Sequence, residues 1–236
     1  QDAFDLGWKL AAVLEGWGGA TLLESYDYER RPASARAAEV SLKNYRRLVS
    51  AAQRAEINAA TPEGDAARRA IGDSLVQENE RTWQPIGVHL GYVYHPSPIV
   101  VPDNSEKPED DTFGYRPTAF PGARAPHIWL AEGRSILDLF GDGFVLLKFA
   151  DVMTDAIERD AKVRGVPLRV CRIDDKKAAV LYERTLVLVR PDGHVAWRGD
   201  SQPPDSMAVI DVVRGAGPLI AARRGEAVRT RPTRDR

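Results

Sequence analysis

Hydrophobic residues recur over the first 85 positions with helical spacing, and capping residues locate the helix ends. Residues Gln1 to Gly16 predict a helix with apolar side chains all around it, so we expect burial on most sides. These side chains are Phe4, Leu6, Trp8, Leu10, Val13 and Leu14. Thr21 and Glu24 have the spacing of a capping box, which predicts a second helix from Leu22, and Pro32 should kink or break it.

Two longer helices are predicted next, followed by a proline-rich stretch. The first runs from Ser34 to Ala60, and the second begins at Pro62 with Thr61 as its cap and ends near Arg81. Seven prolines then lie between Pro96 and Pro126. This composition predicts a connecting region of extended chain laid on a surface, with one short strand from Val88 to Tyr94.

From about His127 to Ala222 the hydrophobic pattern alternates between strand and helix. The predicted elements are strands at 144–150 and 167–173 around a helix at 155–164, a hairpin with strands at 186–190 and 194–198, and a helix from Asp205 or Ser206 to Val213. Pro191-Asp192-Gly193 supplies the backbone angles of the hairpin turn. This order is that of a small α/β sandwich.

Composition limits the partners of the chain. Its 236 residues are 43% hydrophobic and 28% charged, which is ordinary for one or two globular domains. The 33 basic and 34 acidic residues are mixed, so nucleic acid is not expected as a partner. The apolar runs are strand-sized and shorter than the ~20 residues of a membrane span, so no membrane is expected either. A single cysteine, Cys171, suits a reducing, cytoplasmic location.

Few residues are candidates for chemistry, and no catalytic residue or metal ligand is predicted. The four histidines lack metal-ligand spacing, which favours structural or solvated roles; they are His89, His95, His127 and His194. Asp2 and Asp5 are interpreted as complementing the helix dipole, and Asp5 with Lys9 as a surface pair. Glu29-Arg30-Arg31 is interpreted as a structural ion-pair cluster in preference to a substrate clamp.

Two segments resemble one enzyme family. Residues 1–32, QDAFDLGWKLAAVLEGWGGATLLESYDYERRP, resemble the segment after the second FAD-contacting motif of FAD-dependent aromatic (phenol) hydroxylases, the single-component flavoprotein monooxygenases. Residues 188–198, LVRPDGHVAWR, resemble the closing hairpin of the thioredoxin-like domain with which these enzymes often end. Residues 91–100 are similar, more weakly, to phenol and chlorophenol hydroxylases within the family.

The resemblance implies a mixed α+β and α/β fold: a helical remnant of an FAD-binding monooxygenase domain followed by a thioredoxin-like α/β domain. The expected divisions are the helical part at 1–85, a Pro-rich connecting region at 86–126, the thioredoxin-like domain at 127–222 and a basic tail at 223–236. No Cys-x-x-Cys follows the first central strand, so this domain cannot be a dithiol oxidoreductase. The remaining role of the thioredoxin-like domain is packing or subunit contact, which is compatible with a homodimer.

The function implied by the resemblance is hydroxylation of a phenolic aromatic substrate, such as a phenol or chlorophenol, by O2 through a flavin hydroperoxide. FAD is the cofactor, and NADPH or NADH is the co-substrate. In the family, the helix that begins here at Gln1 points its amino-terminal end toward the pyrimidine side of the flavin, where a positive dipole end stabilises negative charge on reduced flavin. Gln1 is therefore the predicted cofactor-binding residue.

The glycine-rich fingerprint and the Gly-Asp motif with which the family holds FAD do not occur in this sequence. We therefore expect the chain to be the carboxyl-terminal part of a longer enzyme and to be inactive by itself. The alternative is a stand-alone binding or assembly module built on a redox-inactive thioredoxin-like domain. The particular phenol, and the choice between NADH and NADPH, are left open.

Overall fold

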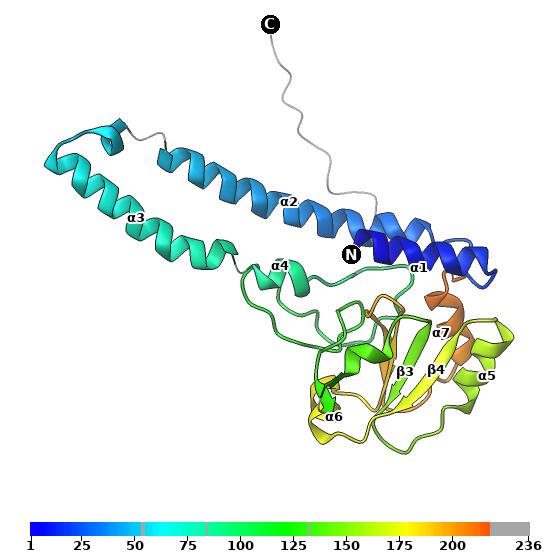
Figure 1. The fold of residues 1–236 in the computed structure, drawn as a ribbon. Coiled ribbons are helices and arrows are strands. Elements are labelled where there is room, and N and C mark those ends of the chain that lie inside the picture. The colour runs from blue at the N-terminus through cyan, green and yellow to red at the C-terminus, as the bar shows by residue number, and fades with distance from the viewer. Residues whose placement is uncertain (53–54, 84, 132, 218–236) are drawn as a thin grey trace, which may run out of the picture.

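Long helices lie beside a four-stranded mixed sheet in the computed structural model, which describes residues 1–52, 55–83, 85–131 and 133–217 (Figure 1). The helical elements of the first part are α1 (Asp2–Leu14), α2 (Glu24–Ala52), a 3-10 helix (Ala55–Asn58), α3 (Pro62–Trp83) and α4 (Ile86–Leu90). Helices α2 and α3 extend away from the sheet, whereas α1 lies next to it (Figure 1). Helix α3 begins at Pro62 as predicted, whereas α2 spans two predicted helices and ends at Ala52, short of the predicted Ala60.

Helix α2 differs from its prediction at both ends and at the proline. It continues unbroken through Pro32, so the predicted break is wrong; the φ angle of proline is itself helical, and neighbouring side chains are anchored by ion pairs. The predicted capping box is also wrong, because the Thr21 hydroxyl donates to the carbonyl oxygen of Gly215 at 2.8 Å and the helix begins at Glu24. The predicted cap of α3 is confirmed: the N–H of Gly64 donates to Thr61 Oγ1 at 3.2 Å.

Helix α1 buries one face only. Trp8 and Ala12 are 8% and 0% exposed, whereas Phe4 is 57% and Leu14 is 85% exposed. The expected burial on most sides is therefore wrong for this structure. On the buried face, the Trp8 ring lies 6.3 Å from that of Trp17 and 6.1 Å from that of Phe144, centroid to centroid. The helix thus packs directly on the sheet.

The sheet has the strand order β4-β3-β5-β6. Its strands are β3 (Phe144–Lys148), β4 (Leu168–Arg172), β5 (Leu186–Val189) and β6 (Val195–Gly199), with helices α5 (Asp155–Val163), α6 (Lys176–Tyr182) and α7 (Ser206–Val213). Strands β3 and β4 are parallel, and the other pairings are antiparallel. The predicted strands, hairpin and two helices are confirmed. Helix α6, capped by Asp175, was not predicted, nor was the small pair β1 (Trp129–Ala131) and β2 (Arg134–Ser135).

Alternation along the strands divides the apolar residues between the two faces of the sheet. Phe144 and Leu146 belong to a core cluster that includes Trp8 of α1, and Val145 and Leu147 belong to a second cluster on the other side. The first cluster also takes side chains from α5 and α7. The first cluster therefore joins the amino-terminal helix to one face of the sheet.

The proline-rich segment after α4 follows the free edge of β6. The predicted strand from Val88 to Tyr94 is wrong, because its first residues form α4 and Val93 makes only an isolated bridge to Ala123. The N–H of Val101 donates to Ala196 at 2.9 Å, and the N–H of Gly122 donates to Val195 at 2.7 Å. Several apolar side chains of the proline-rich segment belong to the two core clusters. The segment therefore covers the edge of the sheet, and the expectation that it only lies on a surface is wrong.

The described residues contain no helix that combines the length and the apolarity needed for a bilayer span. The predicted basic tail at 223–236 lies outside the described residues, as do the last five residues of the predicted domain at 127–222.

Candidate functional site

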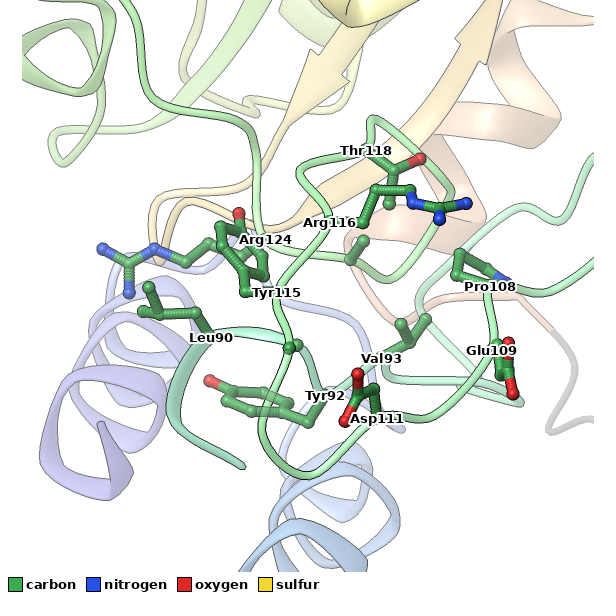
Figure 2. Close-up of a pocket in the computed structure, with 13 residues that line it drawn as sticks. Leu90, Tyr92, Val93, Pro108, Glu109, Asp111, Tyr115, Arg116, Thr118 and Arg124 are labelled. Atoms are coloured by element: carbon green, nitrogen blue, oxygen red, sulfur yellow. The ribbon is translucent and has the colours of Figure 1, made fainter. Parts of the chain in front are cut away.

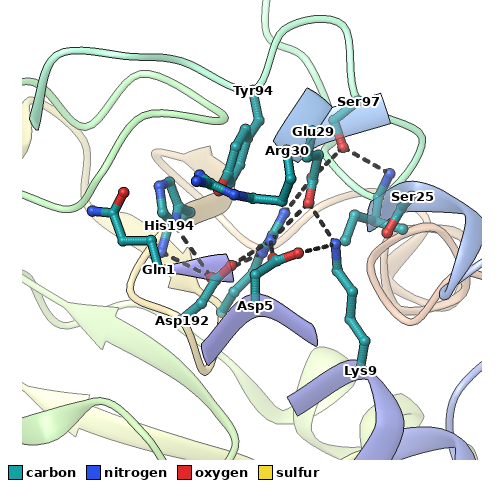
Figure 3. A network of polar contacts seen from close by, with 12 residues as sticks. Gln1, Asp5, Lys9, Ser25, Glu29, Arg30, Tyr94, Ser97, Asp192 and His194 are labelled. Atoms are coloured by element: carbon teal, nitrogen blue, oxygen red, sulfur yellow. Dashed lines mark hydrogen bonds and ion pairs between the residues drawn. The ribbon is translucent and has the colours of Figure 1, made fainter. Parts of the chain in front are cut away.

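A buried network of charged side chains joins α1, α2 and the β5–β6 turn (Figure 3). Asp5 and Lys9 lie one turn apart on α1 and are 2% and 0% exposed. Lys9 Nζ lies 2.8 Å from Asp5 Oδ2 and 2.7 Å from Glu29 Oε2 on α2. The interpretation of Asp5 and Lys9 as a surface pair is therefore wrong, because α2 and the hairpin turn cover this face of α1.

Arg190, at the end of β5, is the centre of the network. It is fully buried, and its Nη2 lies 3.0 Å from both Asp5 Oδ1 and Glu29 Oε2. Its Nε donates to Asp192 Oδ1 at 3.0 Å, within the same turn. The Ser97 hydroxyl also donates to Glu29, at 2.6 Å. The guanidinium thus binds carboxylates from three separate parts of the fold.

The network contains three carboxylates, those of Asp5, Glu29 and Asp192, against the two cations Lys9 and Arg190. Burial raises the pKa of Asp5 to about 6, although Arg190 and Lys9 oppose the rise. For Glu29 burial acts in the same direction, but the charges of Arg190 and Lys9 outweigh it and lower the pKa. The pKa of Asp192 is likewise held well below its usual range, since Arg190 and His194 outweigh burial. A proton is therefore taken up most readily on Asp5.

The elevated pKa of Asp5 predicts a pH-dependent stability. Between pH 4 and pH 6 the folded chain holds a proton that the unfolded chain, with an aspartate pKa of 3.8, has released. The contribution of Asp5 to stability is therefore present at low pH and is lost as pH rises through about 6, by an amount on the order of 3 kcal/mol. Urea unfolding of Asp5→Asn, which cannot titrate, should lack this decline between pH 4 and pH 7.

The matched control for this prediction is Asp27→Asn, since the Asp27 side chain is 66% exposed on α2. Its unfolding free energy should follow the wild-type pH profile. Parallel profiles for the wild type and Asp5→Asn would contradict the assignment of the proton to Asp5.

A second set of contacts orients the start of α1. Arg30 Nε donates to Asp2 Oδ1 at 2.8 Å, and its Nη1 donates to the Tyr94 hydroxyl at 2.9 Å. The hydrogen bond from Arg30 lowers the pKa of Asp2. The Tyr92 hydroxyl donates to Gln1 Oε1 at 2.9 Å. Structural ion pairs are thus confirmed for Arg30, as for Glu29 above, and they act at the beginning of the helix that carries the predicted cofactor contact.

His194 packs against the two tyrosines that take part in these contacts, and their rings also contact each other. Its ring centroid lies 5.6 Å from that of Tyr92 and 4.4 Å from that of Tyr94. The residue is 4% exposed, and Nδ1 lies 3.4 Å from Asp192 Oδ1. Neither ring nitrogen has a hydrogen-bond partner among the described residues. Across all the residues that the structure describes, no group of His, Cys, Asp and Glu side chains is arranged to hold a metal ion.

A cavity of about 300 Å³ opens beside Gln1, between the start of α1 and the hairpin turn. Its walls combine aromatic rings with a few polar groups: Gln1, Phe4, Asp5, Tyr92, Tyr94, Arg124, Leu137, Phe140, Pro191, Asp192, Gly193 and His194. No described residue accepts a hydrogen bond from the amide nitrogen of Gln1, whose oxygen is held by Tyr92. Aromatic walls and a free amide donor suit a planar ring that carries acceptor atoms.

A neighbouring cavity, also of about 300 Å³, lies between the end of α4 and the loop at residues 108–118 (Figure 2). It shares Tyr92 and Arg124 with the first cavity. Its other charged side chains, Glu109, Asp111 and Arg116, carry both signs and are exposed. These features are typical of a solvated loop surface, and the first cavity is the better candidate site.

Arg190 and Asp192 were not predicted as site residues, since the sequence placed Arg190 at the end of a strand and Asp192 in the hairpin turn. A signal was present: an arginine directly follows Leu186–Val189, four residues that are all fully buried. A charge that continues a completely buried strand must find partners inside the protein. The partner identities, however, depend on how α1 and α2 pack on the hairpin.

Two family models match separate parts of this chain. Residues 118–216 match the model described as "Aromatic-ring hydroxylase, C-terminal", and residues 1–41 match the one described as "FAD binding domain". The first match contains Arg190 and Asp192, and the second contains Asp5, Lys9 and Glu29. The buried network therefore lies where the two matched segments meet.

Curated relatives cover nearly the whole chain. The FAD-dependent monooxygenase opdD of Penicillium oxalicum is 36% identical over 228 residues, which are 92% of this chain and 43% of that protein. The 4-methyl-5-nitrocatechol 5-monooxygenase of a Burkholderia species is 30% identical over 89% of this chain and 38% of that protein. The chain thus spans about two fifths of the length of these relatives.

Solved structures show the same arrangement of elements. RebC-10x, native and bound to K252c, is 43% identical, with a TM-score of 0.82 over 92% of this chain and 41% of that one. The flavin-dependent monooxygenase PieE, in complex with FAD and substrate, is 30% identical, with a TM-score of 0.73 over 90% of this chain and 42% of that one. The mixed α+β fold of this chain is thus shared with these enzymes.

Proposed function

This chain is homologous to the carboxyl-terminal part of FAD-dependent aromatic-ring hydroxylases, and we propose that it serves as that part of a monooxygenase acting on a phenolic ring. The observation that carries the proposal is the start of α1, where the Tyr92 hydroxyl orients Gln1 beside an aromatic-walled cavity. This helix lies in the segment that matches the FAD binding domain. NADPH or NADH and O2 are the proposed co-substrates.

The residues at the start of α1 fit one end of the FAD ring system. The free amide N–H groups of Gln1 are suitable donors to a pyrimidine carbonyl oxygen, and the positive end of the helix favours negative charge nearby. The acidic side chains of the first turns do not cancel this charge, because Asp2 is paired with Arg30 and Asp5 with Lys9 and Arg190. When bound, FAD supplies the reduction of oxygen and its transfer to the aromatic ring.

The role proposed for this chain's own residues is to bind and orient. Gln1 would hold the edge of the cofactor, and the walls formed by Phe4 and Phe140 would exclude water from it. The names of two relatives, 4-methyl-5-nitrocatechol 5-monooxygenase and aklavinone 12-hydroxylase, support a hydroxylated aromatic compound as the substrate class. A single phenol ring and a fused polycyclic one are both within this class.

The sheet domain is proposed to be thioredoxin-like and to act in packing. Support comes from the parallel pair β3 and β4 followed by the antiparallel hairpin β5–β6, with helices between and after the strands. The lone cysteine, Cys171, lies on β4 and has no second thiol to form a redox pair. The divisions at residues 85, 126 and 222 remain predictions. The shared core and the ion network connect the described parts on either side of residues 85 and 126.

The test uses the protein expressed from its complete coding sequence. We expect one FAD per chain and oxidation of NADPH or NADH that depends on an added phenol. Gln1→Leu should weaken FAD binding about fivefold, since one hydrogen bond contributes about 1 kcal/mol. Gln202→Leu is the matched control, because Gln202 accepts a hydrogen bond at the start of α5 instead.

A protein that binds no FAD, and whose FAD-free chain is monodisperse and fully folded, would overturn this function in favour of an assembly module. Equal FAD affinities for Gln1→Leu and Gln202→Leu would remove Gln1 from the cofactor site while leaving the enzymatic function in place.

A further inference from the structure

We infer that Arg190 is a positioning residue, which holds the cofactor-facing turns of α1 in place from the distant β5–β6 hairpin. The inference rests on the proposed function, since it assumes that the start of α1 faces FAD. It concerns a residue that lies 185 positions from its partner Asp5 in sequence.

The contacts of Arg190 fix both the place and the rotation of α1. Its Nη2 lies 3.0 Å from Asp5 Oδ1, on the first turn of the helix, and 3.0 Å from Glu29 Oε2 on the neighbouring α2. Its Nε is held at 3.0 Å from Asp192 Oδ1 in the turn that follows. Only the planar, five-donor fork of arginine can serve three carboxylates at once in this way.

Aromatic rings hold the same guanidinium in place. Its central carbon lies 5.3 Å from the ring centroid of Trp8 on α1 and 5.3 Å from that of Tyr94. Tyr94 in turn accepts a hydrogen bond from Arg30, which is paired with Asp2 at the first residue of α1. Arg190 therefore reaches the start of the helix by two routes, directly through Asp5 and indirectly through Tyr94.

Arg198, on β6 of the same hairpin, provides a matched control. It is 6% exposed, and its guanidinium binds Asp103 at 2.7 Å, Glu183 at 2.9 Å and Ser105 at 2.9 Å. None of these partners lies on α1 or α2. Loss of either arginine removes ion pairs of a buried guanidinium from the hairpin, but only loss of Arg190 frees α1.

Hydrogen exchange of the 236-residue chain tests the hold on α1 without any cofactor. Arg190→Met should raise amide exchange rates in residues 4–9 at least tenfold, and Arg190→Lys, which keeps the charge without the fork, should raise them less. Arg198→Met should leave exchange in α1 unchanged. If Arg190→Met does not fold, the comparison of Arg190→Lys with Arg198→Lys replaces it. Equal exchange in α1 for the two arginine positions would overturn the inference.

The flavin of the complete protein provides the second readout. Because a displaced helix end stabilises reduced flavin less, Arg190→Lys should lower the equilibrium constant for flavin reduction about tenfold, which is about 30 mV for a two-electron couple. More of the consumed oxygen should also leave as hydrogen peroxide. Arg198→Lys should match the wild type in both measurements.

These outcomes separate the inference from the function on which it rests. An exchange effect in a protein that binds no FAD would overturn the proposed function but support the hold of Arg190 on α1. FAD binding with unchanged potential and unchanged peroxide release in Arg190→Lys would overturn the positioning role alone.

Discussion

Lys9→Met should lower the free energy of unfolding of the 236-residue chain by about 3–5 kcal/mol, because it leaves buried carboxylates without their cation. Lys9 is 0% exposed and pairs with both Asp5 and Glu29. The network already has one carboxylate more than it has cations, so removal of Lys9 increases the excess of negative charge to two. Urea denaturation at pH 7 measures the loss.

Two companion variants show whether charge balance is the cause. Glu29→Gln removes the excess negative charge while giving up hydrogen bonds, so its cost should be smaller, about 1–3 kcal/mol. Arg31→Met, which breaks an ion pair with side chains 78% and 66% exposed, should change the unfolding midpoint little. A cost for Glu29→Gln as large as that for Lys9→Met would contradict this explanation.

Gly215→Ala should also destabilise the chain strongly, by about 3 kcal/mol or more. Gly215 has a φ of +76°, and a Cβ atom there would lie 2.6 Å from the backbone of Leu22. Gly215 cannot move away from Leu22 easily, because its carbonyl oxygen accepts hydrogen bonds from the N–H and the hydroxyl of Thr21. Left-handed strain and backbone overlap therefore add together. Thermal or urea unfolding would measure the effect.

The control for Gly215 is Gly72, a helical glycine of α3 with open space around the position of a Cβ atom. Gly72→Ala should be neutral or stabilising by up to about 1 kcal/mol, as expected for alanine in a helix. A small effect at Gly215, similar to that at Gly72, would show that the contact between the α1–α2 loop and the end of α7 can shift without cost.

Most of the sheet could be predicted from sequence because its signals are local. The buried runs at β3 and β5, the Pro-Asp-Gly turn and the cap of the last helix each require only neighbouring residues. Helix α6 was missed, although Asp175 caps it through the N–H of Ala178, because its seven residues make a weak periodic signal. The Pro32 break failed for the opposite reason: tertiary contacts of Glu29 and Arg30 override a local breaker.

The candidate site could be predicted only in part. The resemblance of the opening segment pointed to Gln1 and the start of α1, which is one wall of the cavity. Asp5, Lys9 and Glu29 were visible as charges but not as a buried unit, because their burial depends on a hairpin about 160 residues later. Sequence spacing alone cannot show that Arg190 enters between two helices.

The measurement that tests the central claim most directly is the oxygen balance of the protein expressed from its complete coding sequence, supplied with FAD, NADPH or NADH, and a phenol under ¹⁸O2. Mass spectrometry of the product should show one ¹⁸O atom added to the aromatic ring per turnover, and Arg190→Lys should reduce this yield in favour of labelled hydrogen peroxide. A product without ¹⁸O, or with both oxygen atoms from O2, would contradict an FAD-dependent monooxygenase built on this helix and hairpin.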